Sequence, residues 1–162
     1  MIPHEARAAG GAEFALVVGR LIQIFGNVEW QTYEWIRVLR RDQAIWKKYR
    51  GQTLAQRIVA IKALLDAARV PDELRAVAHA AWDAVGPLAG VRNMVTHGPF
   101  AGVDLPEHGE QMGILNLRPA DPSKDYELLP LSTIQSASDG AAEVVIRLQG
   151  ALMAVRSRLA NA

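Results

Sequence analysis

Two long stretches of the chain repeat apolar residues at alternating steps of four and three, and this spacing constrains the fold more than any other feature. Such steps return to the same helix face at each turn. The pattern therefore predicts two long helices, each with one face buried in a helix bundle. The first stripe comprises Phe14, Val18, Leu21, Phe25, Val28, Thr32, Trp35 and Leu39, and the second comprises Ile134, Ser138, Ala141, Val145, Leu148, Leu152, Val155 and Leu159.

Two shorter apolar repeats lie between these stretches. Thr53 and Gln56 have the spacing of a capping box, which predicts the start of a second helix. Val70-Pro-Asp-Glu73 predicts the start of a third, because proline suits the first turn and acidic residues suit the positive end of the helix dipole. Gly86-Pro87 predicts a kink or short break before this helix resumes and ends at His97. The inward positions are Leu54, Ile58, Ile61 and Leu65 in the second helix, and Leu74, Val77, Ala81, Val85 and Leu88 in the third.

Residues 98–130 are rich in glycine and proline, which predicts a long loop or a small hairpin. Within them, residues 113–117 and 126–129 have strand character and could pair across a turn at 119–124. Ser132 and Gln135 form a second candidate capping box. The fold class predicted is all-α: an antiparallel four-helix up-and-down bundle with a kinked third helix and this insertion between helices three and four, in a single domain over 1–162. Gly19 and Gly26, inside the first stripe, predict that a neighbour packs closely there.

Composition excludes some chemistries and leaves others open. The 162 residues contain no cysteine, so disulfides, thiolate metal sites and a thiol nucleophile are excluded. The formal net charge of +1 gives no general signal for nucleic acid. The first eleven residues lack the apolar segment of a signal peptide, and no uncharged apolar run approaches the ~18 residues of a membrane span. We therefore expect a cytoplasmic protein with no membrane association.

Residues 91–99, Val-Arg-Asn-Met-Val-Thr-His-Gly-Pro, group reactive side chains more compactly than any other stretch. Asn93 and His97 are one helical turn apart and share a face, and the long side chain of Arg92 can swing toward His97. A histidine can take and return a proton, and a guanidinium can bind two phosphate oxygens. These groups suit metal-free cleavage of RNA, in which the 2′-hydroxyl is the nucleophile.

The segment Arg92-Asn93-Met94-Val95-Thr96-His97 resembles the Arg-x(4–6)-His signature of the HEPN superfamily, the higher eukaryote and prokaryote nucleotide-binding domains. Many members carry a polar residue directly after the arginine, as Asn93 is here. The sharp match covers these residues and Gly98, whereas the likeness in architecture covers nearly the whole chain. Some family toxins carry a tyrosine two residues after the histidine. Pro99 occupies that position here, so control through that tyrosine is not supported.

The resemblance implies a metal-independent endoribonuclease, such as the toxin of a toxin–antitoxin system or a phage-defence component. It implies Arg92 and His97 as catalytic residues and Asn93 as the residue that orients them. It also implies a homodimer in which two copies of the motif meet in one cleft, with an RNA substrate and an antitoxin protein as partners, and no cofactor.

Two alternatives stay open for the motif. Asn93 and His97 could simply cap a helix end, with Arg92 paired to a buried acid such as Glu29 or Glu34. The chain could then be a non-catalytic interaction or RNA-binding module that dimerises through the bundle. Its recognition surface would be the face with Gly19 and Gly26 or the insertion at 98–130.

A basic cluster follows the first predicted helix and is a candidate RNA-binding surface. Its side chains could bind RNA by charge, and two aromatic residues among them, Trp46 and Tyr49, could stack on bases. A solvated helix end with Trp46 covering the edge of the core explains the same residues. The substrate-binding candidates are Arg40, Arg41, Lys47 and Lys48, with Arg37 and Arg50 beside them.

No metal site is predicted. His79 and Asp83 are spaced as an i, i+4 metal pair, but no third ligand has suitable spacing, so a partly buried histidine with a polar partner is favoured. His4 and His108 lie near acidic residues in predicted loops, where solvated polar clusters are the simpler interpretation.

Overall fold

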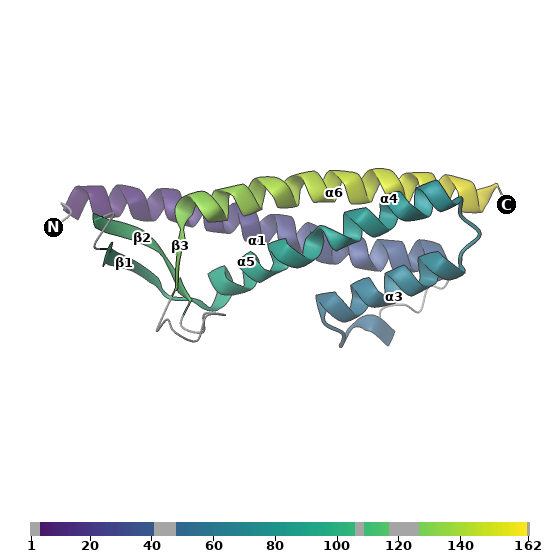
Figure 1. The fold of residues 1–162 in the computed structure, drawn as a ribbon, viewed down its shortest axis with the longest axis horizontal. Coiled ribbons are helices and arrows are strands. Elements are labelled where there is room, and N and C mark those ends of the chain that lie inside the picture. Colours follow the sequence, from purple (N-terminus) through teal and green to yellow (C-terminus); the bar gives the residue numbers. More distant parts are fainter. Residues whose placement is uncertain (1–3, 41–47, 106–108, 117–126, 162) are drawn as a thin grey trace. The chain divides into compact units, whose positions relative to one another are not determined.

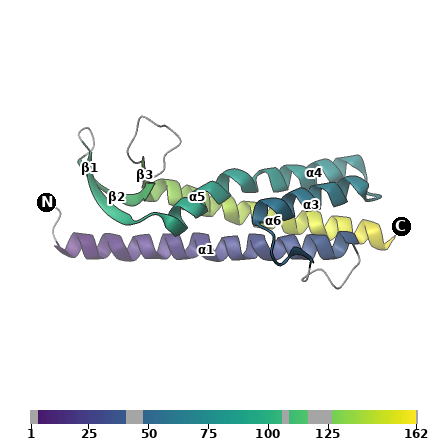
Figure 2. The ribbon, with the colours of Figure 1, turned by 90° about the horizontal axis from the view of Figure 1, so that it is seen from below.

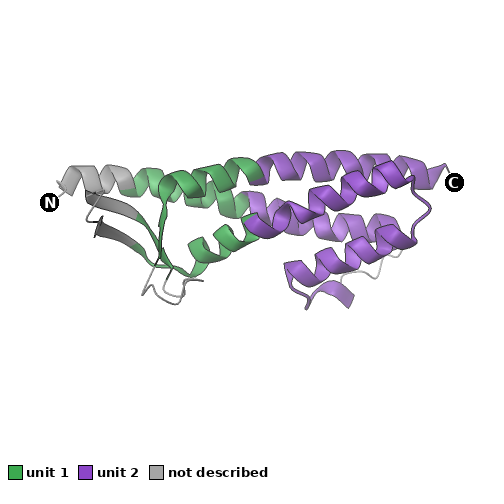
Figure 3. Ribbon diagram, viewed as in Figure 1, with its two compact units in different colours: residues 1–23, 88–140 green, residues 24–87, 141–162 purple. Residues whose placement is uncertain are grey.

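The computed structural model describes residues 4–40, 48–105, 109–116 and 127–161, and it is mostly helical, as predicted (Figure 1). The described residues group into two compact units (Figure 3). Unit 1 comprises residues 1–23 and 88–140, and unit 2 comprises residues 24–87 and 141–162. The helices are α1 (His4–Arg40), α3 (Leu54–Ala67), α4 (Asp72–Asp83), α5 (Val85–His97) and α6 (Leu131–Ala160). The strands are β1 (Phe100–Leu105), β2 (Gly109–Asn116) and β3 (Glu127–Pro130).

The core of unit 2 is organised around two tryptophans. Trp35 of α1 and Trp82 of α4 are almost fully buried, with ring centroids 6.0 Å apart in an edge-to-face arrangement. This geometry suits the ring quadrupoles and adds to the benefit of burying the large rings. Because Trp82 is buried, the buried face of α4 is shifted by one residue from the face that the sequence predicts. Ala78 is buried while Val77 is 57% exposed, so the predicted inward position of Val77 is wrong.

A buried arginine connects α1 to the start of α3 in unit 2. Arg57 is 5% exposed, and its Nε donates to Thr32 Oγ1 at 2.9 Å while its Nη1 donates to the Gln52 carbonyl at 2.6 Å. The guanidinium lies 4.9 Å from the centre of the Tyr33 ring, which favours a cation. The predicted capping box begins α3: the Gln56 backbone N–H donates to Thr53 Oγ1, and the Thr53 N–H donates to Gln56 Oε1. The Arg57 guanidinium is thus buried with hydrogen-bond acceptors for its N–H groups.

Unit 1 contains an antiparallel sheet in the order β1-β2-β3. The predicted pairing of the later part of the insertion is confirmed, since Gly113 lies opposite Pro130 and Asn116 opposite Glu127. The predicted turn at 119–124 lies outside the described residues. Strand β1 was not predicted, because glycine and proline obscure its strand pattern. Phe100, its first residue, stacks on Phe14 of α1 with ring centroids 4.1 Å apart.

Two local predictions are displaced or wrong. The break in the third helix falls at Ala84, just before Gly86-Pro87, and separates α4 from α5. Ser132 does not cap α6, because the helix already begins at Leu131, directly after Pro130 ends β3. Gln135 instead donates to the Asp139 carboxylate along the helix.

The close packing predicted at Gly19 and Gly26 does not occur within the described part of this chain. Both glycines are exposed, and a β-carbon added at either would meet no described atom within 4 Å. Helix α1 is continuous over His4–Arg40 and so includes both positions, although glycine is a poor helix former (Figure 2). Packing against the described part of this chain therefore does not account for these glycines.

Residues Gly11–Arg40 of α1 form a helix long and apolar enough, by length and composition alone, to cross a bilayer. The sequence analysis did not predict this segment as a span, because it considered only uncharged runs and the segment contains charged residues such as Glu13 and Arg20. Of the most apolar 18-residue stretch within this segment, 17% is buried inside the protein. Core helices of water-soluble proteins and signal sequences meet the same criterion, so the segment is weak support for a membrane location.

Candidate functional site

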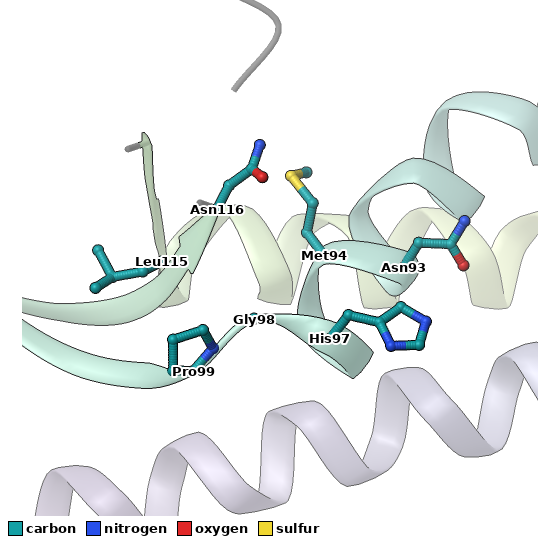
Figure 4. Close-up of a pocket in the computed structure, with 7 residues that line it drawn as sticks. All are labelled: Asn93, Met94, His97, Gly98, Pro99, Leu115 and Asn116. Carbon is teal, nitrogen blue, oxygen red and sulfur yellow. The ribbon is translucent and has the colours of Figure 1, made fainter. Parts of the chain in front are cut away.

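The last turn of α5 is held against β2 by backbone contacts. The Gly98 N–H donates to the Met94 carbonyl at 2.7 Å, and the Leu115 N–H donates to the Pro99 carbonyl at 3.0 Å (Figure 4). A β-carbon at position 98 would lie 2.7 Å from the Leu115 oxygen and 2.8 Å from the Met94 oxygen. Only glycine fits such an approach without displacing backbone. The Gly-Pro sequence thus ends the helix and brings β2 beside it.

The motif residues lie at this helix end. Asn93 and His97 are exposed and Arg92 is half-buried. Arg92 Nη1 donates to Asn93 Oδ1 at 3.0 Å. Figure 4 shows the Asn93 and His97 side chains extending from the same side of α5, as their spacing predicts. None of the three is sealed in the core, so all can be reached from solvent.

The His97 imidazole is available for chemistry. Within the described part of the chain, no side chain hydrogen-bonds to it or forms an ion pair with it. The ring lies in the last turn of α5. It can therefore exchange a proton with a bound ligand without first breaking an internal contact with a described residue.

An open pocket of about 560 Å³ adjoins His97. The residues around it come from the end of α5, from the Gly98-Pro99 link and from the end of β2 (Figure 4). Leu115 and Asn116 were not predicted as site residues, because strand pairing, and not local sequence, brings them to the helix end. The described lining residues are Asn93, Met94, His97, Gly98, Pro99, Leu115 and Asn116, and the Leu115 side chain extends away from those of Met94 and Asn116 (Figure 4).

The acidic partners suggested for Arg92 have arginine partners in unit 2. Glu34 pairs with Arg37 at 2.5 Å, and Glu29 lies 3.7 Å from Arg57. The hydrogen bond that Arg37 donates to Glu34, followed by the negative charge of that carboxylate, raises the pKa of Arg37 above its ordinary value. The two ion pairs therefore do not support the pairing of Arg92 with Glu29 or Glu34.

The basic cluster is only partly described. Arg41, Lys47 and the aromatic Trp46 lie outside the described residues. Arg40 and Lys48 are exposed in unit 2, as an RNA-binding surface would require. Tyr49 is 5% exposed and its hydroxyl accepts a hydrogen bond from Arg40 Nη1 at 3.2 Å. Its ring is therefore buried in the unit, and the predicted stacking of bases on Tyr49 is wrong.

His79 belongs to a charged group between α3 and α4. Its Nε2 lies 2.9 Å from Asp66 Oδ1, while Asp83 pairs with Lys62. The i, i+4 pairing of His79 with Asp83 is thus replaced by two contacts between helices. Among the described residues, to which His108 does not belong, no group of three or more His, Asp or Glu side chains is placed to hold a metal ion. His79 therefore has the polar partner that the sequence favoured.

The chain matches no protein-family model, no curated protein and no solved structure.

Proposed function

We propose that the chain is a HEPN-like, metal-independent endoribonuclease, with His97 and Arg92 as catalytic residues and Asn93 as a positioning residue. The observation that carries the proposal is an exposed imidazole beside an open pocket, one turn from an amide that a neighbouring arginine holds. An imidazole transfers protons near neutral pH, and a guanidinium stabilises the charge that grows on a phosphate.

In the proposed reaction the 2′-oxygen of the RNA attacks the adjacent phosphorus. The new bond to the 2′-oxygen forms as the bond to the 5′-oxygen of the next nucleotide breaks, leaving a 2′,3′-cyclic phosphate and a 5′-hydroxyl. His97 accepts the proton of the 2′-hydroxyl or donates one to the leaving oxygen. Arg92 binds the non-bridging oxygens. Its hydrogen bond to Asn93 fixes the direction from which it does so.

A homodimer completes the proposal. A single motif supplies one imidazole, whereas the reaction needs a base and an acid, so two copies facing one RNA would supply both. We further propose a single domain over 1–162 built as an antiparallel four-helix up-and-down bundle. We place it in the cytoplasm, as a toxin with an antitoxin protein or as a phage-defence component. Arg40, Arg41, Lys47 and Lys48 would contact the RNA backbone.

The test is cleavage of a labelled RNA in EDTA. The wild type is expected to cleave RNA and to leave a 2′-deoxy substitute intact. His97→Ala and Arg92→Ala are each expected to lower the rate about 100-fold or more, with unchanged circular dichroism. His79→Ala and Arg147→Ala are matched controls, because both residues lie in unit 2 with partners of their own. Equal rates in all five proteins would refute the assignment.

Exposed apolar side chains favour the second candidate, a non-catalytic interaction module. Leu16 and Trp30 on α1 are 75% and 53% exposed, and Ile146 and Met153 on α6 are 71% and 58% exposed. Large exposed apolar side chains are typical of surfaces that pair with another protein. Stable self-association of a protein that binds no RNA in gel-shift and sedimentation experiments would favour this candidate over the nuclease.

A further inference from the structure

We infer that the pocket beside His97 is a nucleobase subsite and that Asn116 of β2 is its specificity-determining residue. The inference rests on the proposed ribonuclease function, which assigns the motif but says nothing of how a base is held. The pocket, of about 560 Å³, lies within the size range of sites for small organic ligands. It is also large enough for one nucleotide.

The lining suits a flat, neutral ring with a polar edge. Met94 and Pro99 supply apolar surface for a ring, and a thioether makes favourable contacts with aromatic rings. Asn93 and Asn116 supply amides, which donate and accept hydrogen bonds at a base edge. Among the described lining residues there is neither a carboxylate nor a lysine or arginine. A base fits this chemistry better than a charged ligand does.

Electrostatics separate the base from its phosphate. The pocket lies at the carboxyl end of α5, where the helix dipole is negative and disfavours an anion. Arg92 does not belong to the described lining, but it donates to Asn93, which does. A phosphate is therefore expected at the arginine side of Asn93, and the adjoining base is expected over Met94.

The two amides lie on different walls of the pocket. Asn93 Oδ1 accepts from Arg92, which leaves its amino group as a donor toward an oxygen or ring nitrogen of any base. Asn116 stands on the other wall, and its side chain extends alongside that of Met94 (Figure 4). It is far from the motif in sequence and is placed by the pairing of β2. Asn116 can therefore change the preferred base without disturbing the motif.

The experiment is cleavage-site mapping on a random-sequence RNA pool. The wild type is expected to favour one base about tenfold at one position beside the cut, as a good amide–base contact gives. Asn116→Ala is expected to reduce that preference to about twofold. Asn116→Asp, which keeps the shape but loses the donor, is expected to change the ranking of the bases. Asn27→Ala, an exposed asparagine on α1, is the matched control and should leave the preference unchanged.

A second measurement separates this inference from the nuclease assignment. His97→Ala protein is titrated with four fluorescent homopolymer RNAs, and anisotropy reports binding. Preferential binding of one homopolymer, lost on adding Asn116→Ala, supports the base subsite even where the wild type cleaves nothing. Cleavage that keeps its base ranking in both Asn116 variants overturns the inference and leaves the nuclease intact. Equal or absent binding of all four homopolymers also overturns it.

Discussion

Unit 1 and unit 2 each contain an arginine beside polar partners, and the surroundings of the two side chains differ. In unit 2, Arg57 is buried, with donors committed to Thr32 and to a backbone carbonyl. In unit 1, Arg92 is half-buried at a helix end and donates to an exposed asparagine beside an exposed histidine. Arg57, whose N–H groups donate to atoms inside the fold, stabilises the fold. Arg92, which lies near an open pocket, can contact a ligand.

The largest effect on stability is expected from Arg57→Ala. The change leaves the Gln52 carbonyl and the Thr32 hydroxyl without their donor, so we expect a loss of about 3 kcal/mol in the free energy of unfolding. Arg57→Lys should recover only part of it, since an ammonium cannot reproduce the fork geometry. Urea denaturation measures both, with Arg92→Ala for comparison. A loss from Arg92→Ala as large as that from Arg57→Ala would abolish the contrast between the two arginines.

Gly98→Ala is expected to cost about 1–3 kcal/mol, because the new methyl group would press on the backbone oxygens of Met94 and Leu115. The same change should move β2 away from α5 and lower any RNA cleavage. Thermal unfolding and the EDTA cleavage assay measure the two effects. A variant as stable and as active as the wild type would show that the helix end does not depend on this close approach.

Gly19→Ala is the matched opposite. An added methyl group meets no described atom there, and alanine is the better helix former. We expect a gain of about 0.5–1 kcal/mol in the free energy of unfolding by urea titration. A loss would mean that this face of α1 is covered in solution, as a dimer through α1 would require.

The smallest effect is expected from His79→Ala. Its contact with Asp66 is a surface ion pair when the imidazole is protonated, and such pairs contribute less than about 1 kcal/mol. The free energy of unfolding should change by that much or less, and by less still in 1 M salt. A loss of 2 kcal/mol in the free energy of unfolding would show that His79, like Arg57, stabilises the core of unit 2.

The helices could be predicted from sequence because their signal is local. The stripes of α1 and α6 repeat over many turns, and Leu21, Phe25, Ile134 and Leu148 are buried as predicted. The face of α4 was misjudged at Val77, because the size of Trp82 outweighs the regular spacing. Strand β1 was missed because its identity depends on pairing with β2, which the residues of β1 alone do not reveal.

The candidate site also contains residues that local sequence predicts and residues that only the strand pairing brings there. Arg92, Asn93 and His97 lie within two turns of one helix, so sequence could group them. Asn116 and Leu115 reach them only through the register of β2 and the space left by Gly98. The buried state of Arg57 gave no sequence signal either, because it arises from partners on two different segments.

The bond from the Leu115 N–H to the Pro99 carbonyl has an evolutionary consequence. Main-chain atoms alone make this attachment, so it survives almost any exchange of the side chains at positions 115 and 116. A lineage could therefore change what the wall of the pocket accepts by single replacements at position 116, while Arg92 and His97 stay fixed. The same property makes position 116 the natural place to build a library of altered selectivity.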